Sequence, residues 1–271
     1  MMNELQRREL DIFKTCLDIC EKLNIRYYLV CGSALGAAKY QGFIPWDDDM
    51  DVGMPRSDYE VFLKEAPALL PEGIFLQNFR TDSAFFHIFS KLRDSNTTLI
   101  EKGIEHLPIH HGVYIDIFPL DGYPESTFER VVFEWKKKVF SWKIYCAILE
   151  TKNLKVRVRN QLFRILGYHK RTAKTLMKLE KLYKKYPAES SEWWCNHGNW
   201  QRKLEYAHRS QYGNGKQTFF EGVPVIIPEK FDEYLTQKYG DWRSDLPVEK
   251  RKTHHNIVVC DLNRSYKEYM K

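Results

Sequence analysis

The sequence predicts a mixed α/β (α+β) protein built as one large domain, and three observations support this. The chain has 271 residues, of which 43% are hydrophobic and 14% aromatic, enough to bury a sizeable core and to exclude a disordered or fibrous protein. Strand and helix patterns alternate up to about residue 121, and a continuous helical pattern follows. No apolar run approaches the roughly 20 residues that a membrane-spanning helix needs.

The first elements follow from periodicity. Residues 3–24 carry apolar side chains among charges at helical spacing, which predicts an amphipathic helix. Residues 27–31 are short and β-rich, and we expect a buried strand ending at Gly32-Ser33. Residues 34–39 favour a helical turn because they are rich in Ala.

Glycine and proline residues then divide the chain. Alternation over 47–53 predicts a second strand, and the periodic pattern from Ser57 to Leu70 predicts a helix. Three more strands are expected: 74–79, 87–92 and 113–118.

The rest of the chain is expected to be helical before it returns to mixed structure. The pattern from 125 to 186 is helical, with a break near Gly167. Residues 218–227 read as a hairpin, and a helix from Pro228 should end at Gly240. We expect three parts: a catalytic core (1–124), a basic helical segment (125–200), and a hairpin and helix packing back on the core (201–271).

The net charge of +6 is unevenly distributed. Residues 1–120 hold 12 basic and 18 acidic groups, whereas residues 121–271 hold 30 and 18. Most of the excess lies in 130–185, where 17 Lys or Arg face 3 Glu. Such a field attracts a polyanion, which could be nucleic acid, a phosphate-rich polymer or an anionic membrane, although solvated helix faces are the simpler explanation.

Residues 128–145 suggest a peripheral membrane contact. Apolar and aromatic residues there could form one helix face beside three consecutive lysines, namely Phe128, Val131, Val132, Trp135, Val139, Phe140 and Trp142. Such a face can lie on anionic lipid, here at the inner face of a membrane, or it can pack onto the core.

The cysteines and the first residues favour a reduced, cytoplasmic protein. The six cysteines form no CxxC pair, and the opening residues contain no apolar signal segment.

Four carboxylates are crowded into five residues. If Asp47 to Gly53 is a strand, then Asp47, Asp49 and Asp51 share one face and Asp48 points away. Carboxylates this close repel one another unless cations lie between them, and hard oxygen ligands suit Mg²⁺. The alternative, an exposed acidic turn, is weakened by the apolar residues that flank the cluster.

A small-residue loop, CGSALG, precedes these carboxylates. Gly32 allows a close backbone approach, and Ser33 lies where the N-terminus of a helix would face a phosphate. Together with the DxD strand, this loop predicts phosphoryl-transfer chemistry, which needs both a phosphate cradle and a metal platform.

Several segments closely resemble the LicD family of phosphocholine transferases, whose core motif is shared by the fukutin-related proteins. These segments are GSALGAAKYQGFIPWDDDMDVGMPRSDYEVF, KLRDSNT, YIDIFPLDG, FEGVPVIIPEKFDEYLTQKYGDW and EKRKTHH. The resemblance implies a nucleotidyltransferase (polymerase β-like) mixed sheet flanked by helices, with the basic helical segment as an insertion.

By this resemblance, Gly32 and Ser33 fill the loop, Asp49 and Asp51 form the DxD pair, and Asp116 is the third carboxylate. Asp47 resembles an extra carboxylate before the pair. The apolar context of Asp116 agrees, because an isolated buried Asp needs a charge partner. Asp121 is the competing candidate, but its Pro and Gly neighbours favour a turn.

The resemblance implies transfer of phosphocholine from CDP-choline to a sugar hydroxyl of a teichoic acid or lipopolysaccharide-type glycan of the cell envelope, with release of CMP. One or two Mg²⁺ ions, or alternatively Mn²⁺, would be held by Asp49, Asp51 and Asp116. Asp47 is a candidate base. Lys91 and Arg93 could pair with donor phosphates or lie exposed on an edge strand.

A trimethylammonium group needs an aromatic or acidic pocket. The sequence offers several rings without deciding among them, namely Trp46, Trp193, Trp194, Trp200, Tyr206 and Tyr212. Asp241, Trp242 and His254 lie in late motifs that match the family, so Trp46, Asp241 and His254 are candidates for the pocket.

Three other functions remain open. The donor could be another CDP-alcohol, such as CDP-glycerol or CDP-ribitol. The same carboxylates could transfer nucleotides. In a different class, the basic segment could track nucleic acid beside an inactive site, but no zinc, RRM or KH signature supports nucleic-acid binding, and we expect none.

Overall fold

A mixed sheet forms the centre of the molecule. The computed structural model describes the whole chain except residues 1, 151–152, 199–204, 252, 254–255 and 271. The α-helices are α1 (Glu4–Lys22), α2 (Cys31–Tyr40), α3 (Arg56–Glu65), α4 (Thr127–Ile148), α5 (Leu154–Ile165), α6 (Thr172–Tyr183), α7 (Arg209–Tyr212) and α8 (Phe231–Tyr239). The strands are β1 (Tyr28–Leu29), β2 (Asp51–Pro55), β3 (Ile74–Gln77), β4 (Ser90–Asp94), β5 (Thr98–Glu101), β6 (Val113–Gly122), β7 (Trp193–Asn196), β8 (Tyr206–His208), β9 (Lys216–Phe220), β10 (Val223–Ile227) and β11 (Ile257–Asp261).

Strand β6 organises the sheet, whose order is β1-β2-β6-β4-β3. It runs parallel to β2 and antiparallel to β4, and its last residues pair with β7, which in turn pairs with β8. All ten residues of β6 are buried, so the strand is covered on both faces. The hairpin β9-β10 and the pair β5-β11 form two separate ribbons.

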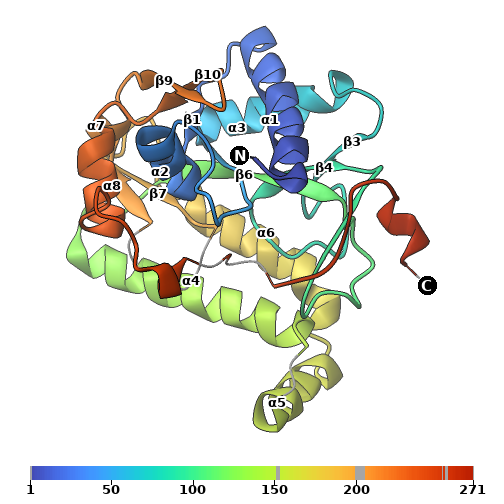
Figure 1. The fold of residues 1–271 in the computed structure, drawn as a ribbon. Helices are drawn as coiled ribbons and strands as arrows, with labels where there is room; N and C mark the ends of the chain where they lie inside the picture. The colour runs from blue at the N-terminus through green and yellow to red at the C-terminus, as the bar shows by residue number, and fades with distance from the viewer. Residues whose placement is uncertain (1, 151–152, 199–204, 252, 254–255, 271) are drawn as a thin grey trace.

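Helices cover both faces of the sheet (Figure 1). α1 and α3 lie on one side, where an apolar cluster joins them to the strands through Phe13, Phe62 and Ile115. α4 and α6 lie on the other side, where Phe133, Leu176 and their neighbours form a second cluster. Figure 1 also shows α5 projecting from the end of α4, away from the sheet. Of the helices in the described residues, none is long and apolar enough to cross a membrane.

Most of the predicted elements are confirmed, with shifted ends. The helix predicted for 3–24 is α1, and its start is fixed by a capping box between Asn3 and Gln6. The helical stretch 125–186 divides into α4, α5 and α6, with the predicted break at Gly167, which adopts φ +75°. The hairpin over 218–227 and the helix ending at Gly240 are also present.

Two expectations about strands are wrong. The strand predicted for 47–53 begins only at Asp51, so Asp47 and Asp49 belong to the preceding loop. The strand predicted to end at residue 118 continues through Pro119 to Gly122, because β2 and β7 pair with its second half. Four strands, β5, β7, β8 and β11, lie outside the segments whose sequence pattern predicts a strand.

Candidate active site

A cavity of about 270 Å³ opens between the start of α2, the loop that precedes β2, and the segment after α8. Six residues predicted from the sequence to belong to the site line this cavity: Gly32, Trp46, Asp47, Asp49, Asp51 and Asp241. Residues from both ends of the chain are therefore brought together at one opening. Three of the four carboxylates that are crowded into residues 47–51 therefore line this cavity.

Ser33 fixes the beginning of β2. Its Oγ accepts a hydrogen bond of 2.8 Å from the backbone N–H of Asp51, and both residues are buried. Helix α2 begins at Cys31, so its N-terminal turn borders the cavity and brings the positive end of the helix dipole to it. The loop predicted at Gly32-Ser33 is thus the first turn of α2, and Ser33 joins this helix N-terminus to the strand that carries Asp51.

Asp51 and Asp116 are direct neighbours on the parallel strands β2 and β6. Burial raises the pKa of Asp51 well above its usual value, and the charges of Asp49, Asp116, Asp47 and, more weakly, Glu205 raise it further. The cluster therefore resists full ionisation and would be stabilised by added positive charge.

Lys91 supplies one positive charge to this cluster. It lies opposite Asp116 on the antiparallel strand β4, and its Nζ is 2.6 Å from Asp116 Oδ1. The ammonium group also lies 3.3 Å from the centre of the Tyr114 ring. Burial raises the pKa of Asp116 and lowers the pKa of Lys91, while their mutual attraction opposes both shifts. The contact is an ion pair rather than a well-aligned hydrogen bond, because Oδ1 lacks a partner with hydrogen-bond geometry.

The carboxylates of this cluster are suitable ligands for a hard divalent cation, but they do not form a complete metal-binding site in this structure. Asp49, Asp51 and Asp116 offer carboxylate oxygens, and burial together with the neighbouring carboxylates raises the pKa of Asp51, so that a bound cation would favour its ionised form. Within the described part of the chain, no three acidic, His or Cys side chains converge with the geometry of a preformed metal site. Lys91 is paired with one of the oxygens that a metal would use.

Asp47 and Asp48 point in different directions, as the alternation predicted, although neither is in a strand. Asp47 lines the cavity, and a Cβ placed on Gly32 would lie 3.0 Å from its Oδ2. Asp48 instead accepts a hydrogen bond of 2.6 Å from Thr253. The carboxylate of Asp47 can therefore occupy this position only because Gly32 has no side chain.

Lys91 and Arg93 are not on an edge strand, so the expectation of edge exposure is wrong. β4 lies between β3 and β6, and both side chains are buried. Arg93 donates to Gln77 Oε1 and to the carbonyl of Gly112, 2.6 Å away, and its guanidinium lies over Tyr114. These contacts tie Arg93 to the protein interior.

Asp121 is not a turn residue, which corrects the expectation from its neighbours. It lies in β6, and its carboxylate accepts two hydrogen bonds, of 2.7 and 2.6 Å, from the guanidinium of Arg56. Its side chain is 1% exposed. Arg56 therefore satisfies the carboxylate of Asp121, whereas Asp116 is the direct neighbour of Asp51 in the sheet.

Aromatic side chains form one wall of the cavity. Tyr40 and Trp46 pack edge to face with their ring centres 6.2 Å apart, and Tyr239 and Trp242 also line the space. The guanidinium of Arg251 lies 5.1 Å from the Trp46 ring centre. Aromatic faces and carboxylates therefore border the same cavity.

The other aromatic candidates are not among the residues that line the cavity. Trp194 and Tyr212 belong to an apolar cluster, and Trp193 and Tyr206 pack near the Arg130 guanidinium. Trp200 and His254 lie outside the described residues.

A further buried carboxylate, Glu205, acts on Asp51 although no sequence motif marks it. Glu205 is 5% exposed, and its Oε2 is 2.6 Å from Lys238 Nζ. The same carboxylate and ammonium lie 3.9 Å from the thiol of Cys31, which lines the cavity. The sequence contains no motif at Glu205, because this residue reaches the site only through the pairing of β7 and β8 with a part of the sheet that is far away in the chain.

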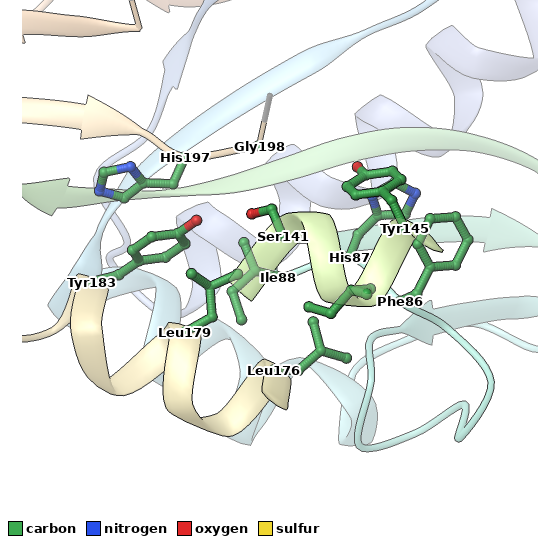
Figure 2. Close-up of a pocket in the computed structure, with 11 residues that line it drawn as sticks. Phe86, His87, Ile88, Ser141, Tyr145, Leu176, Leu179, Tyr183, His197 and Gly198 are labelled. Carbon is green, nitrogen blue, oxygen red and sulfur yellow. The ribbon is translucent and has the colours of Figure 1, made fainter. Parts of the chain in front are cut away.

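A second internal space lies between α4, α6 and the sheet (Figure 2), but it does not suit a substrate. Its volume is about 20 Å³, enough for about one water molecule. Burial lowers the pKa of His87 to about 3 and that of His197 well below its usual value, so both imidazoles are neutral. The acidic cavity, at about 270 Å³, is much the larger of these two spaces.

Comparison with known proteins relates the region that contains the carboxylates to one family. Residues 24–147 match the family model described as LicD/FKTN/FKRP, nucleotidyltransferase domain. The chain is 27% identical over 268 residues to the lipopolysaccharide cholinephosphotransferase LicD of Haemophilus influenzae, covering 94% of this chain and 97% of that protein. An uncharacterized protein of Rickettsia prowazekii is 30% identical over 130 residues, or 48% of this chain and 45% of that protein. Residues 24–147, which contain the carboxylate cluster, therefore form a domain of the LicD/FKTN/FKRP family, and the chain as a whole is similar to a LicD protein over nearly its full length.

Proposed function

We propose that this protein is a phosphotransferase that moves phosphocholine from CDP-choline to a sugar hydroxyl of a lipopolysaccharide-type glycan and releases CMP. The observation that carries the proposal is the carboxylate cluster in which Asp49 and Asp51 line the cavity and Asp116 is the neighbour of Asp51 in the sheet. The name of the Haemophilus relative, which aligns over 94% of the chain, supports the choice of group and acceptor. A teichoic acid is the alternative acceptor.

We further propose that the cluster binds Mg²⁺, with Mn²⁺ as the alternative, in one or two sites. Asp49, Asp51 and Asp116 would hold the ion, which would neutralise the diphosphate and the leaving CMP. For Asp116 to bind the ion through Oδ1, the ion pair between this oxygen and Lys91 has to weaken. An ammonium released in this way stays within reach of the same region and can pair with a donor phosphate, the role predicted for Lys91 and Arg93. Only Lys91 among these two faces the cluster.

The reaction exchanges one P–O bond for another. The acceptor hydroxyl attacks the phosphorus that carries choline, the bond to the CMP oxygen breaks, and the hydroxyl proton is transferred to a base. Asp47 is the candidate base because it lines the cavity outside the proposed metal-binding set. The N-terminal turn of α2, at Gly32 and Ser33, is placed to stabilise negative charge on the phosphates.

The choline group would bind along the aromatic wall. A quaternary ammonium cannot donate hydrogen bonds and is attracted to ring faces and carboxylates. Trp46, Tyr239 and Trp242 provide rings, and Asp241 provides a nearby charge. A CDP-alcohol with a polyhydroxyl group, such as glycerol or ribitol, would make less use of these rings.

The fold would then be a nucleotidyltransferase (polymerase β-like) core. The parallel neighbours Asp51 and Asp116, the Gly-Ser turn before them and the description of the family model support this assignment. The same core is compatible with nucleotidyl transfer, so the experiment has to separate the two reactions.

CMP release from a panel of CDP-alcohols, with Mg²⁺ and candidate glycans, tests the proposal. We expect release from CDP-choline and a loss on the order of 10³-fold in Asp49→Asn and Asp51→Asn. Asp48→Asn is the matched control, because Asp48 contacts Thr253 rather than the cavity. Release of CMP only from CDP-glycerol or CDP-ribitol would show that the donor is one of these compounds and not CDP-choline. Pyrophosphate release from nucleoside triphosphates would replace the proposed reaction by nucleotidyl transfer.

A further inference from the structure

The basic helical segment forms a groove that is unrelated to the acidic cavity. Between α4 and α6, Trp135, Val139, Phe140 and Leu182 line a groove of about 540 Å³. Its rim consists of Lys136, Lys178, Lys181 and Lys185. The groove thus combines an apolar floor with a positive border.

A second, more polar pocket continues this groove. It has a volume of about 440 Å³ and shares Phe140 and Lys178 with the groove. Lys143, Arg171 and Lys174 complete its positive lining. Across the described residues, Lys185 is the one cation of the groove and pocket with a carboxylate within 4 Å, namely Glu129 at 3.9 Å. The remaining cations are therefore available to an external anion.

Helix α5 adds an exposed apolar stripe to the basic helical segment. Leu154, Val158, Leu162 and Ile165 recur at helical spacing and are between 54% and 73% exposed. The opposite face of α5 contacts the protein: Phe163 packs against Trp142 and against Tyr168, which lines the basic pocket. Figure 1 shows the helix projecting from the body of the molecule, and the four side chains of the stripe are exposed to solvent.

The predicted contact region 128–145 is partly exposed in the same way. Phe128, Val131 and Trp135 are 64% or more exposed, whereas Phe133 and Ile144 pack in the core. Exposed apolar groups of this size are unusual on a protein that meets only water.

We propose that the groove, the basic pocket and the α5 stripe dock the protein on a bilayer that contains anionic phospholipids. The charges match lipid phosphates, and the exposed Leu, Val and Trp side chains match the boundary between headgroups and acyl chains. Nucleic acid would use the charges but would leave the apolar stripe in water. Docking goes beyond the proposed transfer reaction and does not depend on it, because the surface contains no residue of the acidic cavity.

Flotation with vesicles tests this docking without any turnover. We expect the full chain to bind vesicles of phosphatidylcholine mixed with phosphatidylglycerol, to bind pure phosphatidylcholine much less, and to lose affinity as salt increases. Lys174→Glu with Lys178→Glu should reduce binding roughly tenfold or more, since each basic residue adds attraction to an anionic surface. Val158→Asp with Leu162→Asp should also reduce it.

Matched controls lie on the far side of the sheet. Lys22→Glu with Lys64→Glu reverses two exposed charges on α1 and α3, and Val61→Asp changes an exposed apolar residue on α3. These variants should bind like the parent protein. The proposal is overturned if the parent protein does not float with anionic vesicles, if it binds neutral vesicles equally, or if the α5 and α6 variants bind as well as the controls. Binding to an RNA oligonucleotide without binding to vesicles would also overturn it. Activity on a water-soluble acceptor should be unchanged in every variant, which separates this test from the test of the transfer reaction.

Discussion

Lys91 and Asp116 face each other across the antiparallel strands β4 and β6, with Lys91 Nζ 2.6 Å from Asp116 Oδ1. This ion pair is buried at the edge of a cluster whose other charged members are carboxylates. It places a cation of the protein where a metal ion is proposed to bind. The stability of the protein and its affinity for Mg²⁺ should therefore be linked through Lys91.

Replacing Lys91 by Met tests this link. In the absence of metal, the variant should lose about 3 kcal/mol of unfolding free energy, because it leaves a buried carboxylate without its partner. Added Mg²⁺ should recover more stability in the variant than in the parent protein. Urea unfolding with EDTA or with Mg²⁺ measures both values, and Lys64→Met is an exposed control. Equal stabilisation of the two proteins by Mg²⁺ would contradict the link.

The pKa of Asp51 gives a prediction about pH. A carboxylate whose folded-state pKa is raised contributes stability that is complete below its unfolded value, near 4, and is lost as pH rises through the folded value. In EDTA, Asp51→Asn should therefore gain thermal stability relative to the parent protein as pH increases from about 4. Melting curves across this range measure the difference. The control variant Asp48→Asn should have the same dependence of melting temperature on pH as the parent protein. If Asp51→Asn also has this dependence, the ionisation of Asp51 does not destabilise the folded protein and the prediction is wrong.

Asp121 should matter for stability rather than for chemistry. Its buried pairing with Arg56 predicts that Asp121→Asn loses about 3–5 kcal/mol of unfolding free energy, because the guanidinium is left without its counter-charge. At a temperature where the variant remains folded, its turnover should stay within a few-fold of the parent protein. A loss of turnover as large as that in Asp116→Asn would instead place Asp121 in the active site.

Gly32→Ala should impair the site while leaving the fold intact. The new methyl group would lie 3.0 Å from Asp47 Oδ2, closer than an ordinary contact, so Asp47 would have to shift. Because small displacements at a reacting centre are costly, we expect turnover to fall by about tenfold or more. Melting temperature should change little. Full activity in this variant would show that the position of Asp47 is not critical.

The acidic site could be predicted from the sequence because its residues are close together in the chain. Asp47, Asp49 and Asp51 lie within five residues, and Gly32 and Ser33 lie in the first turn of α2, just after the strand β1 that pairs with β2. Asp116 could be added because an Asp in an apolar strand needs a partner and because the surrounding motif resembles the family. Its immediate partner, Lys91, was assigned to donor phosphates, since only the sheet register shows that the two side chains meet.

The remaining features depend on contacts between distant segments. The pairing of β6 with β7 keeps Asp121 inside a strand where its neighbours suggested a turn. Glu205 comes close to Asp51 because β7 and β8 extend the sheet beyond β6. These two strands are short and weakly patterned, so their pairing cannot be predicted from the sequence. The charge of the segment 130–185 was visible in the sequence, but the exposed stripe of α5 required knowledge of which helix faces pack on α4.

Transfer of labelled choline phosphate to a glycan tests the central claim most directly. The protein would be incubated with Mg²⁺, CDP-choline labelled in its choline group, and a lipopolysaccharide-type acceptor, and the label bound to the acceptor would be measured. We predict that the parent protein and Asp48→Asn label the acceptor and that Asp51→Asn does not. Label that remains in the small-molecule pool, or that reaches the acceptor equally well with Asp51→Asn, would contradict the claim.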